Sequence, residues 1–188
     1  EYDGKCFYDT AATSSRQVRV DEQFTCLSAD YVLTDVNTAQ KCFNSSTNGA
    51  ITLASSTAYR FEALYIITNT GTTSHTWGVL FGGTATFSSL MYRAEGRTGV
   101  TSPATLTAVS DAYNLNASIL VVTAASTSAT EQVIIKLDGT MRINAGGTVI
   151  PQIQMSAAPV GTQTMLKSSY IRFWPIGSNT VATVGNWS

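Results

Sequence analysis

The single histidine, His75, is the first residue to test for chemistry, because imidazole is the usual general base near neutral pH. It lies in the segment Gly71-Thr-Thr-Ser-His-Thr-Trp77, which is typical of a turn that leads into a strand. A catalytic histidine needs a nucleophile and an orienting acid, and neither a Gly-x-Ser-x-Gly nor a Cys-Gly-x-Cys signature occurs in the chain. We therefore interpret His75 as a surface or interface histidine.

Two carboxylates at a suitable separation suffice for glycoside hydrolysis, so the acidic residues are the next candidates. Those in the expected strands and loops are Glu62, Glu95, Asp111, Glu131 and Asp138. We expect structural roles for them, such as a pair between Arg60 and Glu62 and a bulge at Asp138-Gly139. A depolymerase that acts on capsular sugar is the least favoured of the functions considered.

The three cysteines, Cys6, Cys26 and Cys42, lie in the first quarter of the chain and lack Cys-x-x-Cys spacing. With one histidine they do not form a usual zinc site, and an odd number does not form a disulfide framework. We expect reduced residues in the core or at a subunit interface. A bridge from Cys26 to Cys6 or to Cys42 is the alternative in an oxidising compartment. No cofactor or metal site is expected.

Glycine pairs occur at Gly82-Gly83 and Gly146-Gly147. Each lies between expected strands, where a positive φ is needed, and neither precedes a helix that could hold a phosphate. We interpret both pairs as turns.

Aromatic residues at expected strand ends and in loops are the best candidates for a functional surface. A neutral polar surface commonly binds glycans by stacking sugars on such rings, and the same rings also fill subunit interfaces. The sequence leaves both interpretations open. The candidates for a glycan or interface contact are Trp77, Tyr92, Tyr113 and Trp187.

The elements that must position these residues are almost all strands. Segments rich in Val, Ile, Tyr, Phe and Thr recur from Gln23 onward, separated by clusters of Gly, Asn, Ser and Thr. The helical signal is a single turn over Thr38–Phe43, with Asn37 placed to cap it. The expected strands are 24–33, 58–68, 74–81, 86–93, 105–110, 117–123, 131–144, 148–156, 169–176 and 181–186.

Two long strands show the clearest alternation. In 58–68 the odd positions are apolar, and Leu64 and Ile66 make the second face apolar too, which predicts a central strand or one covered by a neighbouring subunit. The strand over 131–144 is followed by a glycine-rich turn and by the strand over 148–156, so we predict a hairpin. The pattern as a whole predicts an all-β fold, an antiparallel, jelly-roll-like β-sandwich.

Charge is scarce in this chain. Only 12% of the residues are charged and the net charge is −1, so the abundant serine and threonine must cover the surface. Lysine and arginine are dispersed, so we expect no binding to nucleic acid. No apolar run approaches the roughly 18 residues of a membrane-spanning helix, so we expect no membrane insertion. We expect residues 1–22 to form an arm or shaft-to-head linker, and residues 23–188 to form one distal β-sandwich domain.

Structural motifs are grouped at the two ends of the chain. The start carries Glu1-Tyr-Asp-Gly4, Phe7-Tyr8 and Thr38-Ala-Gln-Lys41. The end carries Tyr170-Ile-Arg-Phe-Trp-Pro-Ile-Gly177 and Val184-Gly-Asn-Trp-Ser188. Together with Gly-Gly-Thr-Ala at 82–85, these segments resemble the C-terminal, distal domains of bacteriophage tail-fibre and virion structural proteins.

The resemblance implies a non-enzymatic homotrimer with a fibre-knob or TNF-like jelly roll, joined to other virion proteins through its N-terminal arm. It also implies a place on an extracellular virion, after synthesis in the host cytoplasm. The cysteines depart from the family pattern, and the resemblance assigns no receptor-contact residue. The leading hypothesis is a distal fibre domain that attaches to a host surface receptor or glycan. The alternative is a capsid decoration, cement or head-fibre protein.

Overall fold

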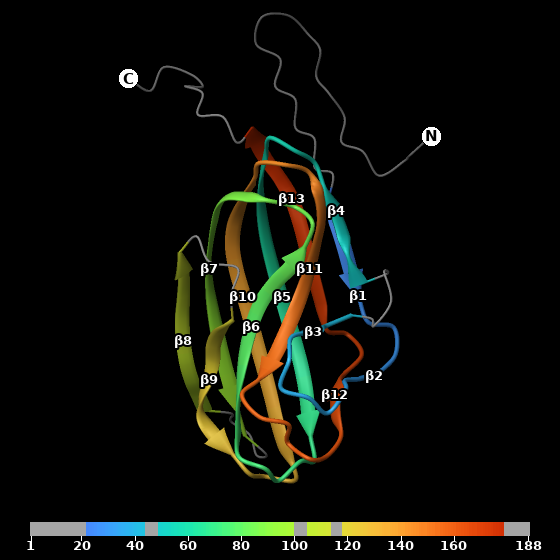
Figure 1. The fold of residues 1–188 in the computed structure, drawn as a ribbon, viewed down its shortest axis with the longest axis vertical. Helices are drawn as coiled ribbons and strands as arrows, with labels where there is room; N and C mark the ends of the chain where they lie inside the picture. The colour runs from blue at the N-terminus through green and yellow to red at the C-terminus, as the bar shows by residue number, and fades with distance from the viewer. Residues whose placement is uncertain (1–21, 44–48, 100–104, 114–117, 179–188) are drawn as a thin grey trace, which may run out of the picture.

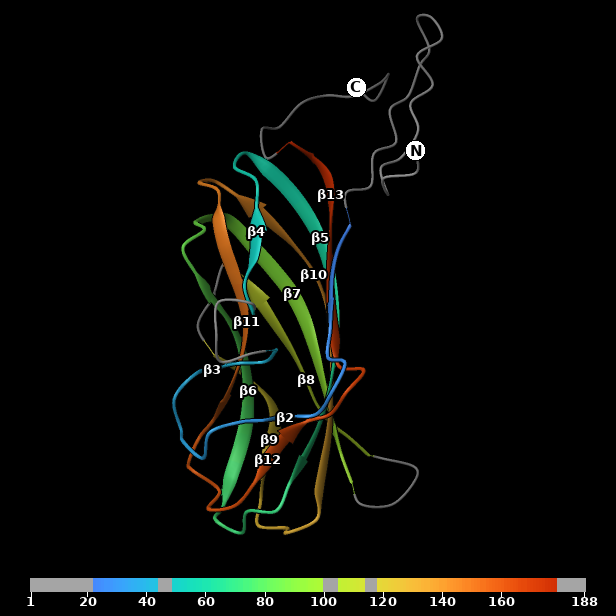
Figure 2. The same ribbon diagram turned by 90° about the vertical axis from the view of Figure 1, so that its right-hand side faces the viewer.

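The chain forms two antiparallel β-sheets that face each other (Figure 1). The structure is a computed structural model that describes residues 22–43, 49–99, 105–113 and 118–178, with the side chains of 105–113 left out. Figure 2 shows the sheets as two layers, with β6 and β11 in one and β5, β10 and β13 in the other. The prediction of an all-β, antiparallel fold is confirmed.

The larger sheet has the strand order β1-β13-β5-β10-β7-β8, with β12 and β2 beside the end of β5. Its strands are β1 (Gln23–Cys26), β2 (Tyr31–Val32), β5 (Thr57–Asn69), β7 (Phe87–Thr98), β8 (Thr105–Tyr113), β10 (Glu131–Ile143), β12 (Gln163–Met165) and β13 (Tyr170–Ser178). β5 and β10 pair without a register shift, from Asn69 opposite Glu131 to Thr57 opposite Ile143. Because β5 lies between β10 and β13, the central place predicted for strand 58–68 is confirmed.

The smaller sheet has the order β3-β11-β6-β9, and β4 also pairs with β11. Its strands are β3 (Gln40–Lys41), β4 (Ile51–Leu53), β6 (His75–Gly83), β9 (Ile119–Ser126) and β11 (Gly147–Met155). The two sheets lie in close contact where Gly96 of β7 packs against the backbone of Val121 in β9. A Cβ atom at Gly96 would overlap the Val121 carbonyl oxygen, so only glycine allows this approach.

The core fills the space between the inner faces of the two sheets. On β5 every odd position from Tyr59 to Ile67 is buried, as the alternation predicts. Phe61 of β5 lies at the centre of an aromatic cluster, with its ring centroid 5.1 Å from that of Phe81 and 5.7 Å from that of Phe173. The Tyr92 ring of β7 joins the same cluster, 5.5 Å from Phe81. Aromatic side chains from both sheets therefore hold the two layers together.

The hairpin predicted over 131–144 and 148–156 is wrong. Both strands exist, but β10 belongs to the larger sheet and β11 to the smaller one. β10 already has β5 and β7 as neighbours, so β11 crosses over and buries its own apolar face from the opposite side. Hydrogen bonds from Asn144 N to Thr86 O (2.8 Å) and from Thr86 N to Ala145 O (3.1 Å) join this crossover to the one between β6 and β7.

Two other local predictions are wrong because tertiary pairing overrides them. The segment predicted as a helical turn, Thr38–Phe43, contains β3, where Gln40 pairs with Ile153 of β11. The single strand predicted over 24–33 is divided into β1 and β2, and Asp30 between them accepts a hydrogen bond from Lys167 N (2.8 Å). The strand predicted over 181–186 lies outside the described residues.

The glycines also differ in part from their predicted roles. Gly83 has a φ of +115° at the end of β6, as expected for a turn, whereas Gly146 and Gly147 do not have positive φ. Asp138-Gly139 forms no bulge, because the register of β10 with β5 runs through it unbroken. A Cβ at Gly139 would overlap Tyr92 on the neighbouring strand, so glycine is needed there for close approach.

The cysteines confirm part of their prediction. Cys42 is a fully buried free thiol, as expected of a core cysteine, whereas Cys26 is exposed on β1. Both are free, so the bridge considered between Cys26 and Cys42 is not formed. Cys6 lies outside the described residues.

We expect Cys42 to resist alkylation between pH 7 and 10 in a Cys6→Ser/Cys26→Ser variant. Burial raises the pKa of the Cys42 thiol, so the reactive thiolate is scarce at a pH where an ordinary cysteine ionises. Unfolding in guanidinium chloride should raise the rate of modification by iodoacetamide about a hundredfold or more, as followed by intact mass. Rapid modification of the folded variant would contradict this placement.

Candidate functional site

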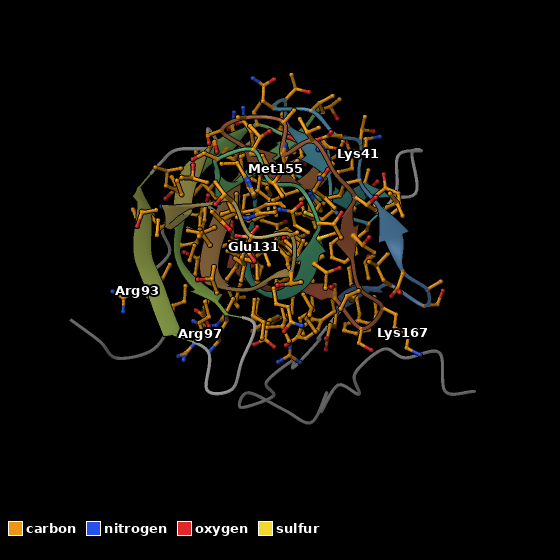
Figure 3. The ribbon with its side chains drawn as sticks, turned by 90° about the horizontal axis from the view of Figure 1, so that it is seen from below. Lys41, Arg93, Arg97, Glu131, Met155 and Lys167 are labelled. Carbon is orange, nitrogen blue, oxygen red and sulfur yellow. The ribbon has the colours of Figure 1, made fainter. Side chains whose placement is uncertain are left out.

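Five polar or partly polar side chains meet inside the lower end of the sandwich as drawn in Figure 1, where β5 ends and β6 begins. Each is at most 3% exposed. We call this group the polar cluster, and its members are Asn69, His75, Trp77, Glu131 and Gln163. Figure 3 shows Glu131 among the side chains between the sheets, whereas Arg93 and Arg97 lie at the periphery. A group of this kind is costly to bury unless its members satisfy one another.

The strands position the polar cluster through their alternation. Asn69 has the same parity as the buried residues of β5, and Glu131 has the same parity as those of β10. His75 shares the inward face of β6 with Trp77. Asn69, Glu131 and His75 each stand at a strand end. The alternation therefore places a polar residue on the inward face at the point where the apolar run stops. The register then places Asn69 directly opposite both Glu131 and Gln163.

The Oε2 atom of Glu131 is the centre of the polar cluster. It lies 2.9 Å from His75 Nε2, accepts a hydrogen bond from Asn69 Nδ2 at 3.0 Å, and accepts another from Trp77 Nε1 at 3.3 Å. Amide and indole N–H groups can only donate, so Oε2 serves as an acceptor for both. One oxygen atom therefore connects β5, β6 and β10.

His75 is held by both of its ring nitrogens. Nδ1 lies 2.8 Å from the Thr73 carbonyl oxygen, which only accepts, so Nδ1 carries a hydrogen. Nε2 lies 2.9 Å from Glu131 Oε2 and 3.1 Å from Asn69 Nδ2, both within hydrogen-bonding distance. The ring is therefore fixed by its contacts with Thr73, Glu131 and Asn69.

Two oxygen atoms of the polar cluster are left without a partner. Asn69 Oδ1 accepts hydrogen bonds from Gly71 N (2.8 Å) and Gln163 Nε2 (3.2 Å). In contrast, Glu131 Oε1 and Gln163 Oε1 are buried and have no hydrogen-bond partner among the residues that the structure describes. An unsatisfied buried acceptor costs about 1–3 kcal/mol, so each is a place where a further donor would be stabilising.

A surface pocket of about 430 Å³ adjoins Glu131 at the same end of the sandwich. Its walls come from the end of β7, the end of β9 and the connection from β9 to β10. Apart from Glu131, the described residues that line it are small or carry hydroxyl groups: Thr98, Gly99, Ala124, Ala125, Ser126, Thr127 and Ser128. We call it the Glu131 pocket.

The described side chains of this site offer one carboxylate, one imidazole and several hydroxyl groups. Both ring nitrogens of His75 lie within hydrogen-bonding distance of protein atoms. Among the lining residues that the structure describes, Glu131 is the sole carboxylate, whereas glycoside hydrolysis usually uses two. Within the described ranges, no group of three or more His, Cys, Asp or Glu side chains is placed to hold a metal ion.

Three of the residues considered from the sequence are buried instead of exposed. The interpretation of His75 as a surface or interface residue is wrong, because it is 1% exposed within this chain. Trp77 is fully buried in the polar cluster and Tyr92 is 4% exposed in the aromatic cluster, so neither ring is open to a glycan. The side chain of Tyr113, at the end of β8, and the whole of Trp187 lie outside what the structure describes.

The hydroxyl groups of two buried tyrosines in the core, Tyr65 and Tyr92, resist ionisation. Burial raises the pKa of Tyr92, and burial with the adjacent Cys42 and Tyr92 raises the pKa of Tyr65. Both phenols therefore stay protonated at any pH at which the protein is handled. Their role is packing, which agrees with their place on the inner faces of β7 and β5.

Two of the other acidic residues, Glu62 and Asp138, form ion pairs on the outer face of the larger sheet. Asp138 binds Arg60 with both carboxylate oxygens, at 2.7 and 2.8 Å, and Glu62 lies 2.8 Å from Arg172 Nε. Structural pairing is thus confirmed for Glu62 and Asp138, but the predicted pair of Arg60 with Glu62 is wrong, since Arg60 pairs with Asp138. Arg60 and Glu62 are two apart on one strand, and the residues directly opposite on β10 and β13 are the nearer partners.

Comparisons with protein-family models and with curated proteins find no match to this chain. No helix of the described part is long and apolar enough to cross a membrane.

Proposed function

We propose that this chain is a non-enzymatic virion structural domain, a homotrimeric distal fibre domain that attaches to a receptor or glycan on a bacterial surface. The observation that carries the proposal is an apolar surface on the larger sheet, which fits contact with further copies of the chain. The motif resemblance at both ends of the chain supports the virion context. The alternative role is a capsid decoration, cement or head-fibre protein.

The order in which the chain visits the two sheets supports a jelly roll of the fibre-knob or TNF-like kind. From β4 onward the chain changes sheet at β5, β6, β7, β9, β10, β11 and β12. Two consecutive pairs, β7 with β8 and β12 with β13, stay within the larger sheet. Crossing between sheets at nearly every connection is what a jelly roll requires.

The apolar patch lies on the outer face of the larger sheet and consists of Phe24, Leu64, Ile66, Ile134 and Tyr170. Phe24 is 58% exposed and Ile134 is 38% exposed. The register makes the patch continuous, because Tyr170 pairs with Leu64 and Ile134 pairs with Ile66, while the Phe24 ring is 5.7 Å from that of Tyr170. Exposed apolar surfaces of this kind mark sites of protein association.

Charged residues surround this patch, as they do at the rim of many interfaces. The Arg60–Asp138 and Arg172–Glu62 ion pairs lie beside it, and Lys136 of β10 is the register partner of Glu95 on β7. In contrast, Lys41 of β3 is the single Asp, Glu, Lys or Arg residue in the described strands of the smaller sheet. The charges of the strands are thus concentrated on one face, which suits a contact of defined orientation between copies.

We expect the parent chain to be a trimer with a mass three times the 20.0 kDa of one chain, and an Ile134→Glu variant to be a monomer. A carboxylate at the centre of the patch would lose its hydration on association, which opposes assembly. The measurement is size-exclusion chromatography with multi-angle light scattering. Leu120→Glu is the matched control, because Leu120 is 48% exposed on β9 of the smaller sheet. A monomeric parent, or equal effects of the two variants, would contradict the proposed interface.

Attachment is tested by binding of the fluorescently labelled full chain to a panel of bacterial strains, measured by flow cytometry. The proposed function expects saturable binding to a subset of strains. A decoration protein would bind no cells and would instead bind virions that lack it, and deletion of residues 1–22 would abolish that binding without unfolding the domain. Binding to neither cells nor virions would exclude both roles.

A further inference from the structure

We propose that Val160 is an apolar anchor that inserts into a pocket of a protein on the bacterial surface. Val160 lies at the tip of the connection between β11 and β12, residues 156–162, which we call the Val160 loop. The inference rests on the proposed attachment function and deepens it, because it names a protein and not a glycan as the receptor.

The backbone of Val160 has an unusual conformation. Its φ is +61°, in the left-handed region that glycine and asparagine adopt most easily. A β-branched residue is poorly suited to this region, because its two Cγ atoms crowd the backbone. Such residues persist only where the surrounding structure holds them, and they are concentrated at binding sites. A valine at this position therefore points to a use for the side chain itself.

That use is not packing within the chain. The Val160 side chain is 69% exposed, more than any other large apolar side chain that the structure describes. The residue before it, Pro159, is buried and holds the base of the tip. The loop thus turns one apolar side chain inward and the next one outward, and the outward one is available to another molecule.

Contacts on two sides hold the Val160 loop in place. The Asp35 carboxylate accepts hydrogen bonds from two successive backbone groups, Val160 N to Oδ1 (3.1 Å) and Gly161 N to Oδ2 (3.2 Å). On the other side, the connection between β5 and β6 donates a hydrogen bond from Thr73 N to Pro159 O (2.9 Å). A side chain that is fixed before binding loses little conformational freedom when it binds, which favours affinity.

Uncharged polar side chains flank the apolar tip. Thr162 N donates to Thr70 Oγ1 (2.9 Å), and Thr70 N donates to Thr162 O (3.0 Å), so the β5–β6 connection lies against the loop. The exposed residues with hydroxyl groups in these two connections are Thr70, Thr72, Thr73, Ser74, Ser156 and Thr162. An apolar centre with a polar rim is the usual arrangement of a protein–protein interface.

The chemistry of the side chain favours a protein over a glycan as the partner. Sugars are bound by flat aromatic rings and by side chains that donate or accept hydrogen bonds. Valine offers neither, whereas its two methyl groups fit an apolar pocket between protein side chains.

The position of the loop agrees with attachment at a distal end. The Val160 loop lies where β11 and β5 end and β6 begins, at the lower end in Figure 1. β13 ends with Ser178 at the upper end. Val160 can therefore face a surface when the molecule is held from the opposite end.

The test compares the full chain with its Val160→Asn variant. Asparagine adopts the left-handed region easily, so we expect the variant to raise the midpoint of thermal unfolding by about 2–4 °C, measured by circular dichroism. On a strain that binds the fluorescently labelled parent, we expect the same variant to raise the concentration for half-saturation tenfold or more in flow cytometry. Loss of binding in a more stable protein separates a contact from a structural role.

Ile176→Asn is the matched control, because Ile176 is also β-branched and is 55% exposed, but it lies near the other end of β13 and has no positive φ. This variant should bind cells as the parent does and should not raise the midpoint. The receptor class is tested on the same strain. Cells treated with proteinase K should lose binding of the parent, whereas cells treated with periodate, which cleaves sugar diols, should keep it.

Unchanged half-saturation in Val160→Asn, or a lower midpoint of unfolding, would overturn the inference. Binding that survives proteinase K but not periodate would assign the contact to a glycan and overturn the protein receptor. A change of oligomeric state in Val160→Asn, measured by light scattering, would place Val160 between copies of the chain and also overturn it. If the parent and Val160→Asn bind cells equally, attachment stands without this anchor. If the parent binds no strain, attachment fails and the anchor fails with it.

Discussion

Replacing Glu131 by alanine is expected to lower the free energy of unfolding by about 3–5 kcal/mol, the cost typical of removing one partner from a buried pair. In the variant the buried N–H groups of Asn69 and Trp77 lose the oxygen atom that accepts their hydrogen bonds. The His75 ring loses the oxygen atom that lies 2.9 Å from its Nε2. Since a domain of this size is stable by about 5–15 kcal/mol in total, the loss is a large part of its stability. Urea denaturation followed by tryptophan fluorescence, at one protein concentration for all variants, measures it.

Asp138→Ala is the matched control, because it removes another ion pair from the same strand. Asp138 and Arg60 are 42% and 45% exposed, so their pair is screened by water and should contribute only about 0.2–1 kcal/mol. In a double-mutant cycle, Glu131→Ala and His75→Ala should show coupling, since the two residues are in direct contact. Equal losses for Glu131→Ala and Asp138→Ala would show that the polar cluster does not hold the lower end together.

Replacing Gly96 by alanine is expected to destabilise the domain by about 3 kcal/mol or more, at or beyond the upper end of ordinary overpacking effects. The added methyl group would overlap the carbonyl oxygen of Val121, which is backbone and cannot rotate away. β7 and β9 would have to separate, and the pairing of β7 with β8 already changes register between Gly96 and Arg97. Thermal and denaturant unfolding followed by circular dichroism measure the loss.

Gly82→Ala is the control for this second prediction. Gly82 is also a strand glycine, but its added methyl group would meet only the side-chain end of Gln152, which is half-buried and can move. Its stability should remain within about 1 kcal/mol of the parent, because alanine also restricts the unfolded chain. A Gly96→Ala variant as stable as Gly82→Ala would mean that the two sheets do not meet at this edge as described.

Most strands of this fold are predictable from the sequence because alternation is a local property. The period of two in 58–68 and 131–144 identifies β5 and β10 nearly to the residue, and it also predicts which of their faces is buried. The same parity carries the signal of the polar cluster, since Asn69, His75 and Glu131 occupy inward positions at strand ends. That signal was present in the sequence, but a polar residue at a strand end is also common in exposed turns.

Pairing between strands is where prediction from the sequence failed, because the partner of a strand is not encoded near it. The turn at 144–147 suits a hairpin, yet β11 joins the other sheet because β10 has no free edge. Likewise, the strand β3 forms in place of the helical turn expected over 38–43, because this segment pairs with β11, which is distant in the sequence. A local preference of a few tenths of a kcal/mol per residue is outweighed by burial of a strand face.

The alternating pattern and the scarcity of charge were enough to establish that this chain is an all-β protein with a neutral polar surface. Tertiary structure alone showed that Trp77 and Tyr92 are core residues and that His75 lies beside Glu131 in the interior. Residues 56 positions apart in the chain meet there because β6 and β10, in different sheets, both begin at the same end of the sandwich. Contacts of that kind depend on how two sheets stack, and stacking is decided by the whole core and not by any local segment.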